Sequence, residues 1–298
     1  MKKHRLKDWV VAVRPWSFPA SAMPVVVTLA YLLWAGYEVC WTNGWWALLN
    51  IIVFHAAGNT WSDYFDYKHR VDAEDTFGAK TLTGGVFTPT EIFRLSLGLL
   101  VVALLGGIGL LLRTGLPLLY IGLAGAACSL LYPPLKYRAW GDVVIFMAYA
   151  VLPTLGTAFA AAGVLPSDVL WVALPIGLIT VAILHANNTR DTSTDARAGI
   201  RTLAMGLGGR CSVWLYAFEV LFPFVWVVGC SLTGVLPYSS LAVLLALVPA
   251  AANVRTMFGY FKGGKEAVAS LDEMTAKLQL LFSLLFALSF VVSVGLGV

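Results

Sequence analysis

Long runs of apolar residues, separated by short polar segments, make up nearly the whole chain. The first run begins near residue 17, after a polar and basic start, and similar runs follow one another to the C-terminus. A run of about 20 apolar residues is long enough to cross a lipid bilayer as a helix. We predict nine such spans, at residues 17–38, 45–61, 92–112, 116–133, 142–163, 168–188, 211–233, 238–257 and 276–297.

The distribution of Lys and Arg supports these nine spans. Basic residues concentrate in the cytoplasmic loops of membrane proteins. With the N-terminus and every second loop inside, the inner segments hold all of the 20 Lys and Arg residues except Arg113. The sequence therefore predicts an integral membrane protein whose N-terminus is cytoplasmic and whose C-terminus lies outside.

The composition excludes an ordinary soluble domain. Hydrophobic residues make up 59% of the chain, charged residues 12%, and the mean hydropathy is +0.80. The net charge of +4 follows from the basic inner loops and requires no nucleic acid as a partner. We predict a single membrane domain over residues 1–298, with pseudo-repeats at about 15–135 and 140–260 and a last helix at about 276–297.

The second predicted span ends in a row of polar side chains, NTWSDYFDYKHRVD, at residues 59–72. In a helix, Asn59, Asp63 and Asp66 occupy positions i, i+4 and i+7, so their oxygen atoms lie on one face. Carboxylates at membrane depth are costly and mark ion or substrate sites. This row is therefore the first candidate for a functional site, and we expect it to face a cation or a cavity.

The same arrangement occurs again at the end of the sixth predicted span, in NNTRDTSTDARAGIRTLAMG. A shift of 128 residues superposes Asn187 on Asn59 and Asp191 on Asp63. Each cluster is followed by a basic loop and then by a basic residue, Thr, Leu and Gly in the same order. Four spans separate the two copies, so both lie on the inner side. A repeated pair of acidic clusters in membrane helices predicts one site built from both copies.

Two facing clusters of oxygen atoms suit Mg²⁺. This ion prefers octahedral oxygen coordination and is held by one or two carboxylates together with phosphate oxygens. The four cysteines are scattered singly and the chain has only four His, which does not favour zinc. Two Mg²⁺ ions bridging a diphosphate are consistent with ionisation of an allylic diphosphate in a membrane cavity. The basic residues beside the clusters are expected to bind the remaining phosphate charge: Lys68, Arg70, Lys80, Arg190, Arg197 and Arg201.

Both motifs, in this order and on these spans, resemble those of the UbiA superfamily of intramembrane prenyltransferases, over nearly the whole chain. The resemblance implies an all-α bundle of nine transmembrane helices around a central cavity. It also implies transfer of a polyprenyl group from its diphosphate to an aromatic carbon. The motifs at Asn59 and Asn187, with Arg14-Pro15 and residues 275–278, look most like the branch that uses 1,4-dihydroxy-2-naphthoate in menaquinone biosynthesis.

That branch implies loss of the acceptor carboxyl group, demethylmenaquinone as the product and a location in the bacterial inner membrane. The loop at residues 132–136, Tyr-Pro-Pro-Leu-Lys, departs from it and resembles other acceptor classes equally. Other acceptors therefore stay open, namely 4-hydroxybenzoate, homogentisate, or a lipid or tetrapyrrole alcohol. The expected partners are the polyprenyl diphosphate, the aromatic acceptor and membrane lipid.

The resemblance also implies a role for each residue of the motifs. The expected metal ligands are Asn59, Asp63, Asp66, Asn187, Asp191 and Asp195, with Asp72 as a further candidate. The ring of Tyr132 would shield the carbocation. The expected catalytic residues are therefore Tyr132 and the four Asp ligands of the metal ions. Lys136 and Arg138 would add to the diphosphate-binding residues. Arg14 and Asn188 are the candidates for binding the acceptor.

Simpler interpretations compete with several of these assignments. Each basic residue also fits the positive-inside rule alone, and Tyr132 also fits an interfacial tyrosine. His55 and His185 precede the motifs, where a single His is more commonly a hydrogen-bonded packing residue. Glu219 is an isolated acid in the seventh span, and we expect it to be either protonated or paired with another residue of the bundle.

One alternative of another class is a transporter for divalent cations or small solutes, because repeats with acids at membrane depth also occur there. The basic loops beside the acids argue against it, since they would repel a free cation.

Overall fold

The computed structural model describes residues 4–68, 80–136 and 138–297, which form helices and no strand. In chain order the elements are α1 (Leu6–Val13), η1 (Pro15–Ser17), α2 (Pro19–Trp34), α3 (Trp41–Lys68), α4 (Pro89–Thr114), α5 (Pro117–Lys136), α6 (Gly141–Phe146), η2 (Met147–Val151), α7 (Leu152–Ala162), η3 (Ser167–Val169), α8 (Leu170–Arg190), α9 (Thr192–Arg197), α10 (Leu203–Leu232), η4 (Tyr238–Ala246), α11 (Leu247–Phe258), α12 (Tyr260–Ala267) and α13 (Leu271–Leu296).

The all-α fold predicted from the sequence is confirmed for the described residues, and each of the nine predicted spans coincides with a helix or with consecutive helical elements. Six helical stretches of the described chain are long and apolar enough to cross a membrane. A seventh is added if α1, η1 and α2, which bend by 53°, count as one span. Helix α3 is not among them. The number of nine membrane crossings therefore stays a prediction.

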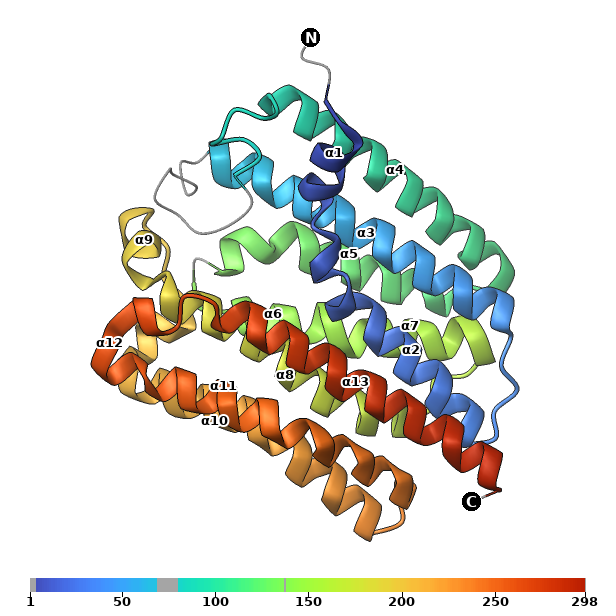
Figure 1. Ribbon diagram of the computed structural model, residues 1–298. Coiled ribbons are helices and arrows are strands. Elements are labelled where there is room, and N and C mark those ends of the chain that lie inside the picture. Colours follow the sequence, from blue (N-terminus) through green and yellow to red (C-terminus); the bar gives the residue numbers. More distant parts are fainter. Residues whose placement is uncertain (1–3, 69–79, 137, 298) are drawn as a thin grey trace.

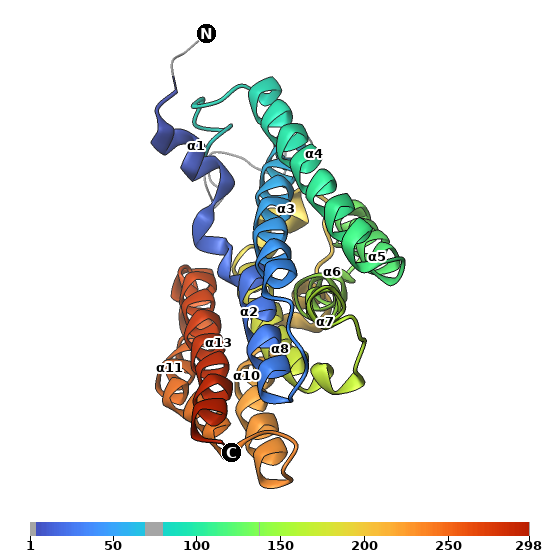
Figure 2. The ribbon, with the colours of Figure 1, turned by 90° about the vertical axis from the view of Figure 1, so that its right-hand side faces the viewer.

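Helix α8 lies at the centre of the bundle, where it packs against α10, α13, α6 and α2. Its residues Ile176 and Ile179 are buried in the same apolar core as Leu32 of α2 and Phe282 and Phe286 of α13. Figure 2 shows α4 and α5 on one side of this core and α11 and α13 on the other. Because α8 is held from several sides, the residues at its end have fixed positions.

The two acidic motifs lie at the same end of the bundle, on the left in Figure 1, where the end of α3 and the short helix α9 are found. Their local structures differ. The first motif lies within α3, which continues to Lys68 instead of ending at residue 61. The second is split: α8 ends at Arg190, Asp191 forms the junction and α9 follows. The two copies thus share the order of their residue types but not the same backbone structure.

Helix α8 approaches η2 closely at Gly177. A β-carbon there would lie 2.6 Å from a ring atom of Phe146 and 2.7 Å from the β-carbon of Ala150. Segment η2 is one turn of π-helix between α6 and α7, and such turns are common at functional sites. Gly177 therefore allows the helices on either side of the candidate site to come together.

We expect Gly177→Ala to lower the free energy of unfolding by ~1–3 kcal/mol, because overpacking forces these helices apart. The matched control is Gly229→Ala in α10, where a β-carbon would meet no atom within 4 Å. The control is expected to be neutral or slightly stabilising. Thermal unfolding in detergent measures both, and equal melting temperatures for the two variants would contradict the close contact at Gly177.

Candidate active site

The polar side chains of Asn59, Asp63 and Asp66 in the first motif are partly or fully shielded from solvent. Asp63 is buried and 3% exposed, while Asn59 and Asp66 are half-buried. The side-chain nitrogen of Asn59 donates hydrogen bonds of 3.0 Å to the carbonyl oxygen of Val13 and to Ser17 Oγ. Its donors are therefore directed at the segment between α1 and α2, which leaves the amide oxygen as the atom that suits a cation.

Arg14 contacts the first motif directly. Its guanidinium pairs with the carboxylate of Asp63, to which Thr81 Oγ1 also donates at 3.5 Å. Arg14 has φ 54°, a left-handed conformation that non-glycine residues rarely adopt and that a specific contact can hold in place. The sequence suggested Arg14 for an acceptor carboxylate, but in this structure its partner is a carboxylate of the protein.

The other residues around the first motif are more exposed. Asp66 accepts a hydrogen bond of 3.0 Å from Ser62 Oγ. The amine of Lys68 lies 5.9 Å from the centre of the Tyr64 ring, and Lys80 is exposed. The predicted site residues Arg70 and Asp72 lie outside the described residues.

Arg190 organises the second motif. It makes five hydrogen bonds of 2.7–3.2 Å, two to the carboxylate of Asp191 and one each to Asn187 Oδ1, Asp272 Oδ2 and the carbonyl oxygen of Ala269. A guanidinium has five N–H donors, so all of them are engaged. The sequence placed Arg190 on the diphosphate. In this structure it instead joins the end of α8 to α13 and orients Asn187 and Asp191, while its contact with diphosphate stays a prediction.

Asp195 of α9 connects the two motifs. The pKa of its carboxyl is raised to about 6, chiefly by burial. Among the neighbouring charges, those of Asp191 and Asp66 also raise this pKa, whereas those of Lys136 and Arg190 lower it. Asp66 belongs to α3 and Lys136 to the end of α5. The structure therefore brings together acids of both motifs and a basic residue that the sequence assigned to the same site.

The remaining predicted residues differ in exposure. Asn188 is buried, Tyr132 and Lys136 are half-buried, and Arg138, Arg197 and Arg201 are exposed at the same end of the bundle. The repeated Thr has different roles in the two copies. Thr81 donates to Asp63, whereas Thr202 accepts from the backbone of Met205 and caps α10.

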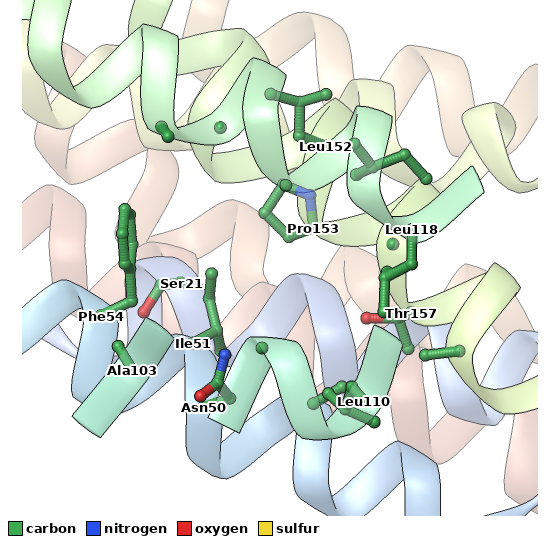
Figure 3. Close-up of a pocket in the computed structure, with 18 of the residues that line it drawn as sticks. Ser21, Asn50, Ile51, Phe54, Ala103, Leu110, Leu118, Leu152, Pro153 and Thr157 are labelled. Carbon is green, nitrogen blue, oxygen red and sulfur yellow. The ribbon is translucent and has the colours of Figure 1, made fainter. Parts of the chain in front are cut away.

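An apolar cavity of about 350 Å³ begins beside the first motif. His55 and Gly58 of α3, one turn or less from Asn59, contribute to its wall. Figure 3 shows side chains from α2, α3, α4, α5 and α7 that converge on it, including Phe54, Leu118 and Pro153. From Gly58 to Ala47 the cavity follows α3 for about 16 Å, at 1.5 Å per residue. An extended apolar chain fits this space.

Aromatic rings lie where the cavity approaches the acidic motifs. The rings of His55 and Tyr149 are 5.1 Å apart and perpendicular. His55 is fixed by Ser21 Oγ at 2.8 Å and Ser17 Oγ at 3.3 Å, as expected of a hydrogen-bonded packing residue. Tyr132 lies near enough to Asp142, Asp66 and Asp195 for their charges to act on its hydroxyl. Sequence reasoning missed Tyr149, because no spacing distinguishes it from other tyrosines of the spans.

Asp272 was also missed, and its only signal in the sequence is an acid in the first turn of the last helix. The position of Glu219 is now explained in part, because its carboxylate lies 3.3 Å from the ring nitrogen Nδ1 of His185. Sequence spacing predicts neither the pair of His185 and Glu219 nor the pair of Arg190 and Asp272, since the partners are 34 and 82 residues apart.

Together, the apolar helices, the facing acidic motifs and the adjoining cavity define a membrane-embedded enzyme of the kind that binds a charged head and an apolar tail. Residues 22–269 match the model of the UbiA prenyltransferase family. The chain belongs to this family, which identifies it as an integral membrane prenyltransferase.

Relatives include UbiA prenyltransferase domain-containing protein 1 of Xenopus tropicalis, 31% identical over 98% of this chain and 84% of the relative. The human protein of that name is 30% identical, over 98% of this chain and 85% of the human protein. The homolog in Drosophila melanogaster is 32% identical over 96% and 79%. These relatives do not single out the naphthoate branch suggested by the motifs.

Solved structures share the fold at low sequence identity. A digeranylgeranylglyceryl phosphate synthase has a TM-score of 0.64 at 18% identity, covering 96% of this chain and 98% of the other. A UbiA homolog from Archaeoglobus fulgidus bound to GPP and Mg²⁺ has a TM-score of 0.62 at 13% identity, covering 94% and 99%. These similarities support the arrangement of helices described here.

The raised pKa of Asp195 predicts how stability depends on pH without divalent ions. Its pKa is about 6 in the folded chain and 3.8 in the reference state. The folded chain therefore binds the proton more tightly, and the free energy of unfolding should fall as pH rises from about 4 to about 6, by at most about 3 kcal/mol. Unfolding in detergent with a chelator, over this pH range, measures the fall.

Asp195→Asn provides the comparison, because it has no carboxyl to ionise. This variant should lose most of the decrease between pH 4 and 6 and be the more stable protein at pH 7. An identical pH profile for both proteins would show that the raised pKa of Asp195 is wrong.

Proposed function

We propose that the chain transfers a polyprenyl group from a polyprenyl diphosphate to an aromatic acceptor, with 1,4-dihydroxy-2-naphthoate as the acceptor and demethylmenaquinol, the reduced form of demethylmenaquinone, as the immediate product. The observation that carries this proposal is the junction of two acidic motifs with an apolar cavity. Asp195 and Asp66 bring the motifs together, and the cavity begins within a turn of Asn59. A diphosphate head with a prenyl tail matches both parts.

The donor set fits Mg²⁺. It consists of the carboxylates of Asp63, Asp66, Asp191 and Asp195 and the amide oxygen of Asn59, all of which are hard oxygen ligands. Burial of Asp195 near other acids leaves negative charge that a cation would neutralise. Bound Mg²⁺, for which we propose two sites, would stabilise charge on the diphosphate as it leaves. The A. fulgidus homolog bound to GPP and Mg²⁺ supports this choice of ion.

The chain's residues then have separate tasks in the reaction. Lys136 near Asp195, and the exposed Lys68, Lys80 and Arg201, would attract and orient the diphosphate oxygens. The bond from the allylic carbon to oxygen breaks, and its electron pair leaves with the diphosphate. The rings of Tyr132 and Tyr149 would stabilise the resulting carbocation by their faces.

The acceptor carbon attacks the carbocation with a pair of ring electrons, and a new carbon–carbon bond forms. For dihydroxynaphthoate, the bond to its carboxyl group then breaks and carbon dioxide leaves. The electrons of that bond restore the aromatic ring. The apolar wall of the cavity would keep water from the carbocation, which water would otherwise convert to an alcohol.

The choice of acceptor rests on the motifs at Asn59 and Asn187 and on the last helix, as given above. The alternatives are 4-hydroxybenzoate, homogentisate and a lipid or tetrapyrrole alcohol. Pairing of Arg14 with Asp63 leaves the acceptor carboxylate to other basic residues unless this pair opens on binding. Asn188 stays a candidate for acceptor contact.

Asp63→Asn and Asp191→Asn should each reduce turnover at least ~100-fold, because each removes a negatively charged ligand from the diphosphate site. Diphosphate release from geranylgeranyl diphosphate, with Mg²⁺ and dihydroxynaphthoate, measures turnover. Glu273→Gln is the matched control, since Glu273 is an exposed acid beside Asp272. Normal turnover in either Asp variant would remove that residue from the site. Transport of Mg²⁺ into vesicles without any turnover would support a transporter instead.

The acceptor is tested by competition at a fixed donor concentration. With dihydroxynaphthoate labelled in its carboxyl group, we expect one labelled carbon dioxide for each prenyl group transferred. 4-Hydroxybenzoate and homogentisate should compete poorly. A prenylated product that keeps the carboxyl group, or faster transfer to 4-hydroxybenzoate, would assign another acceptor while leaving the prenyltransferase activity intact.

A further inference from the structure

Three buried ionisable side chains from three different helices meet inside the bundle. Asp142 of α6 is 7% exposed, Glu219 of α10 is 4% exposed and His185 of α8 is fully buried. His185 Nδ1 lies 3.3 Å from Glu219 Oε1 and 4.0 Å from Asp142 Oδ1. One ligand atom from each residue lies within 4.8 Å of the other two. We call these residues the α6–α8–α10 cluster.

This cluster shares no residue with the proposed diphosphate site but adjoins it, because the charge of Asp142 acts on the hydroxyl of Tyr132. Residues two positions apart in a helix differ by about 200° around its axis, so His185 and Asn187 lie on opposite faces of α8. His185 faces α10, where its Nε2 lies 2.7 Å from Ser212 Oγ. None of the three residues belongs to the repeated motifs.

Four polar atoms of the cluster have no hydrogen-bond partner within the described chain. These atoms are both carboxylate oxygens of Asp142, Nδ1 of His185 and Oε2 of Glu219. Buried carboxylates without partners are costly, and one proton on His185 could serve only one of the two acids. Arg190, the nearest basic residue along α8, is occupied by Asp191, Asn187 and Asp272. The cluster therefore has an excess of acceptors pointing at one another.

The hydrogen bonds around His185 are compatible with a lone pair on Nδ1 that a cation could accept. Ser212 Oγ lies 2.7 Å from Nε2 of His185 and 2.8 Å from Thr189 Oγ1. A proton on Nε2 can be donated to Ser212, which in turn donates to Thr189. Nδ1 then faces the two carboxylates with its lone pair. Histidines that bind metals are oriented in this way, with the second ring nitrogen donating to a fixed acceptor.

We propose that Asp142, His185 and Glu219 bind one divalent transition-metal ion, with Zn²⁺ as the ion of choice. Two carboxylates and a neutral imidazole carry a charge of −2, so a divalent ion makes the buried site neutral. A nitrogen ligand favours zinc over magnesium. Zinc bonds of ~2.0–2.1 Å in tetrahedral geometry place ligand atoms about 3.3 Å apart. His185 Nδ1 and Glu219 Oε1 have this separation, whereas Asp142 Oδ1 lies 4.0 Å from Nδ1 and would move toward the bound ion.

The bound ion would connect α6, α8 and α10 behind the second acidic motif. Its role is to fix the end of α8 and thereby the positions of Asn187 and Asp191. Because the ligands are buried, the ion would be acquired during folding and released slowly. Metal content and stability report on this site whether or not the proposed prenyl transfer is correct.

The test uses the full chain, purified in detergent, stripped with a chelator during partial unfolding and refolded with Zn²⁺. We expect one Zn²⁺ per chain after gel filtration in metal-free buffer, measured by mass spectrometry, and a higher melting temperature than that of the metal-free protein. Co²⁺ in place of Zn²⁺ should give the visible absorption bands of a tetrahedral site. Excess Mg²⁺ should not displace either ion.

Variants assign the ion to the cluster. Glu219→Gln and His185→Gln keep the side-chain size and should reduce retained Zn²⁺ at least ~10-fold, with loss of the melting-temperature shift. Ser212→Ala should weaken binding ~10–100-fold through the orientation of His185. Asp168→Asn, which alters an acid bonded to Tyr31 instead, should retain the ion fully. Circular dichroism and gel filtration verify that each variant is folded.

Three outcomes would overturn the proposal. The first is a wild-type protein that retains no Zn²⁺ and shows no shift in melting temperature, which would mean that the cluster is held by protons alone. The second is retention of as much Zn²⁺ by Glu219→Gln and His185→Gln as by the wild type. The third is loss of the ion from Asp63→Asn or Asp191→Asn while the cluster variants keep it, which would place the ion at the diphosphate site.

Discussion

Repulsion between carboxylates is the constraint on which the arrangement of this protein depends. Two acidic motifs converge at one end of an apolar bundle, where water screens charge poorly. Each motif is therefore paired with an arginine side chain of its own. Arg14 pairs with Asp63 in the first, and Arg190 holds Asp191 in the second. Asp195, between them, keeps a raised pKa because Lys136 only partly offsets its burial and the neighbouring acids.

The cations also determine how the helices are joined. Through Arg14, the segment before α2 is fixed to α3. Through Arg190, the end of α8 is fixed to Asp272 at the start of α13. Helices that are distant in sequence thus meet at the ends where the motifs lie. The apolar faces of α2, α8 and α13 align the same helices from within. Charge pairing and core packing therefore support one geometry.

Separation of polar and apolar regions gives the site its chemical character. The carboxylates and basic residues lie at the end of the bundle, and the cavity behind them is lined mostly by aliphatic and aromatic side chains. His55 lies at the boundary, with its ring nitrogens satisfied by Ser17 and Ser21 and its ring against Tyr149. A substrate with a diphosphate head and an apolar tail has only one orientation that suits both regions. The reactive carbon of such a substrate would lie near the aromatic rings.

The sequence by itself determined the membrane class, the helical spans and the two acidic motifs, because these depend on local periodicity and on residue types repeated at a fixed spacing. It also placed Asn59, Asp63 and Asp66 on one helical face, and α3 has this geometry. Only the tertiary structure decided that Arg14 pairs with Asp63, that Arg190 contacts Asp272 and that His185 meets Glu219 and Asp142. These contacts join residues far apart in the chain, and their formation depends on how the helices pack. A sequence pattern contains the spacing within one helix but not the distance between two.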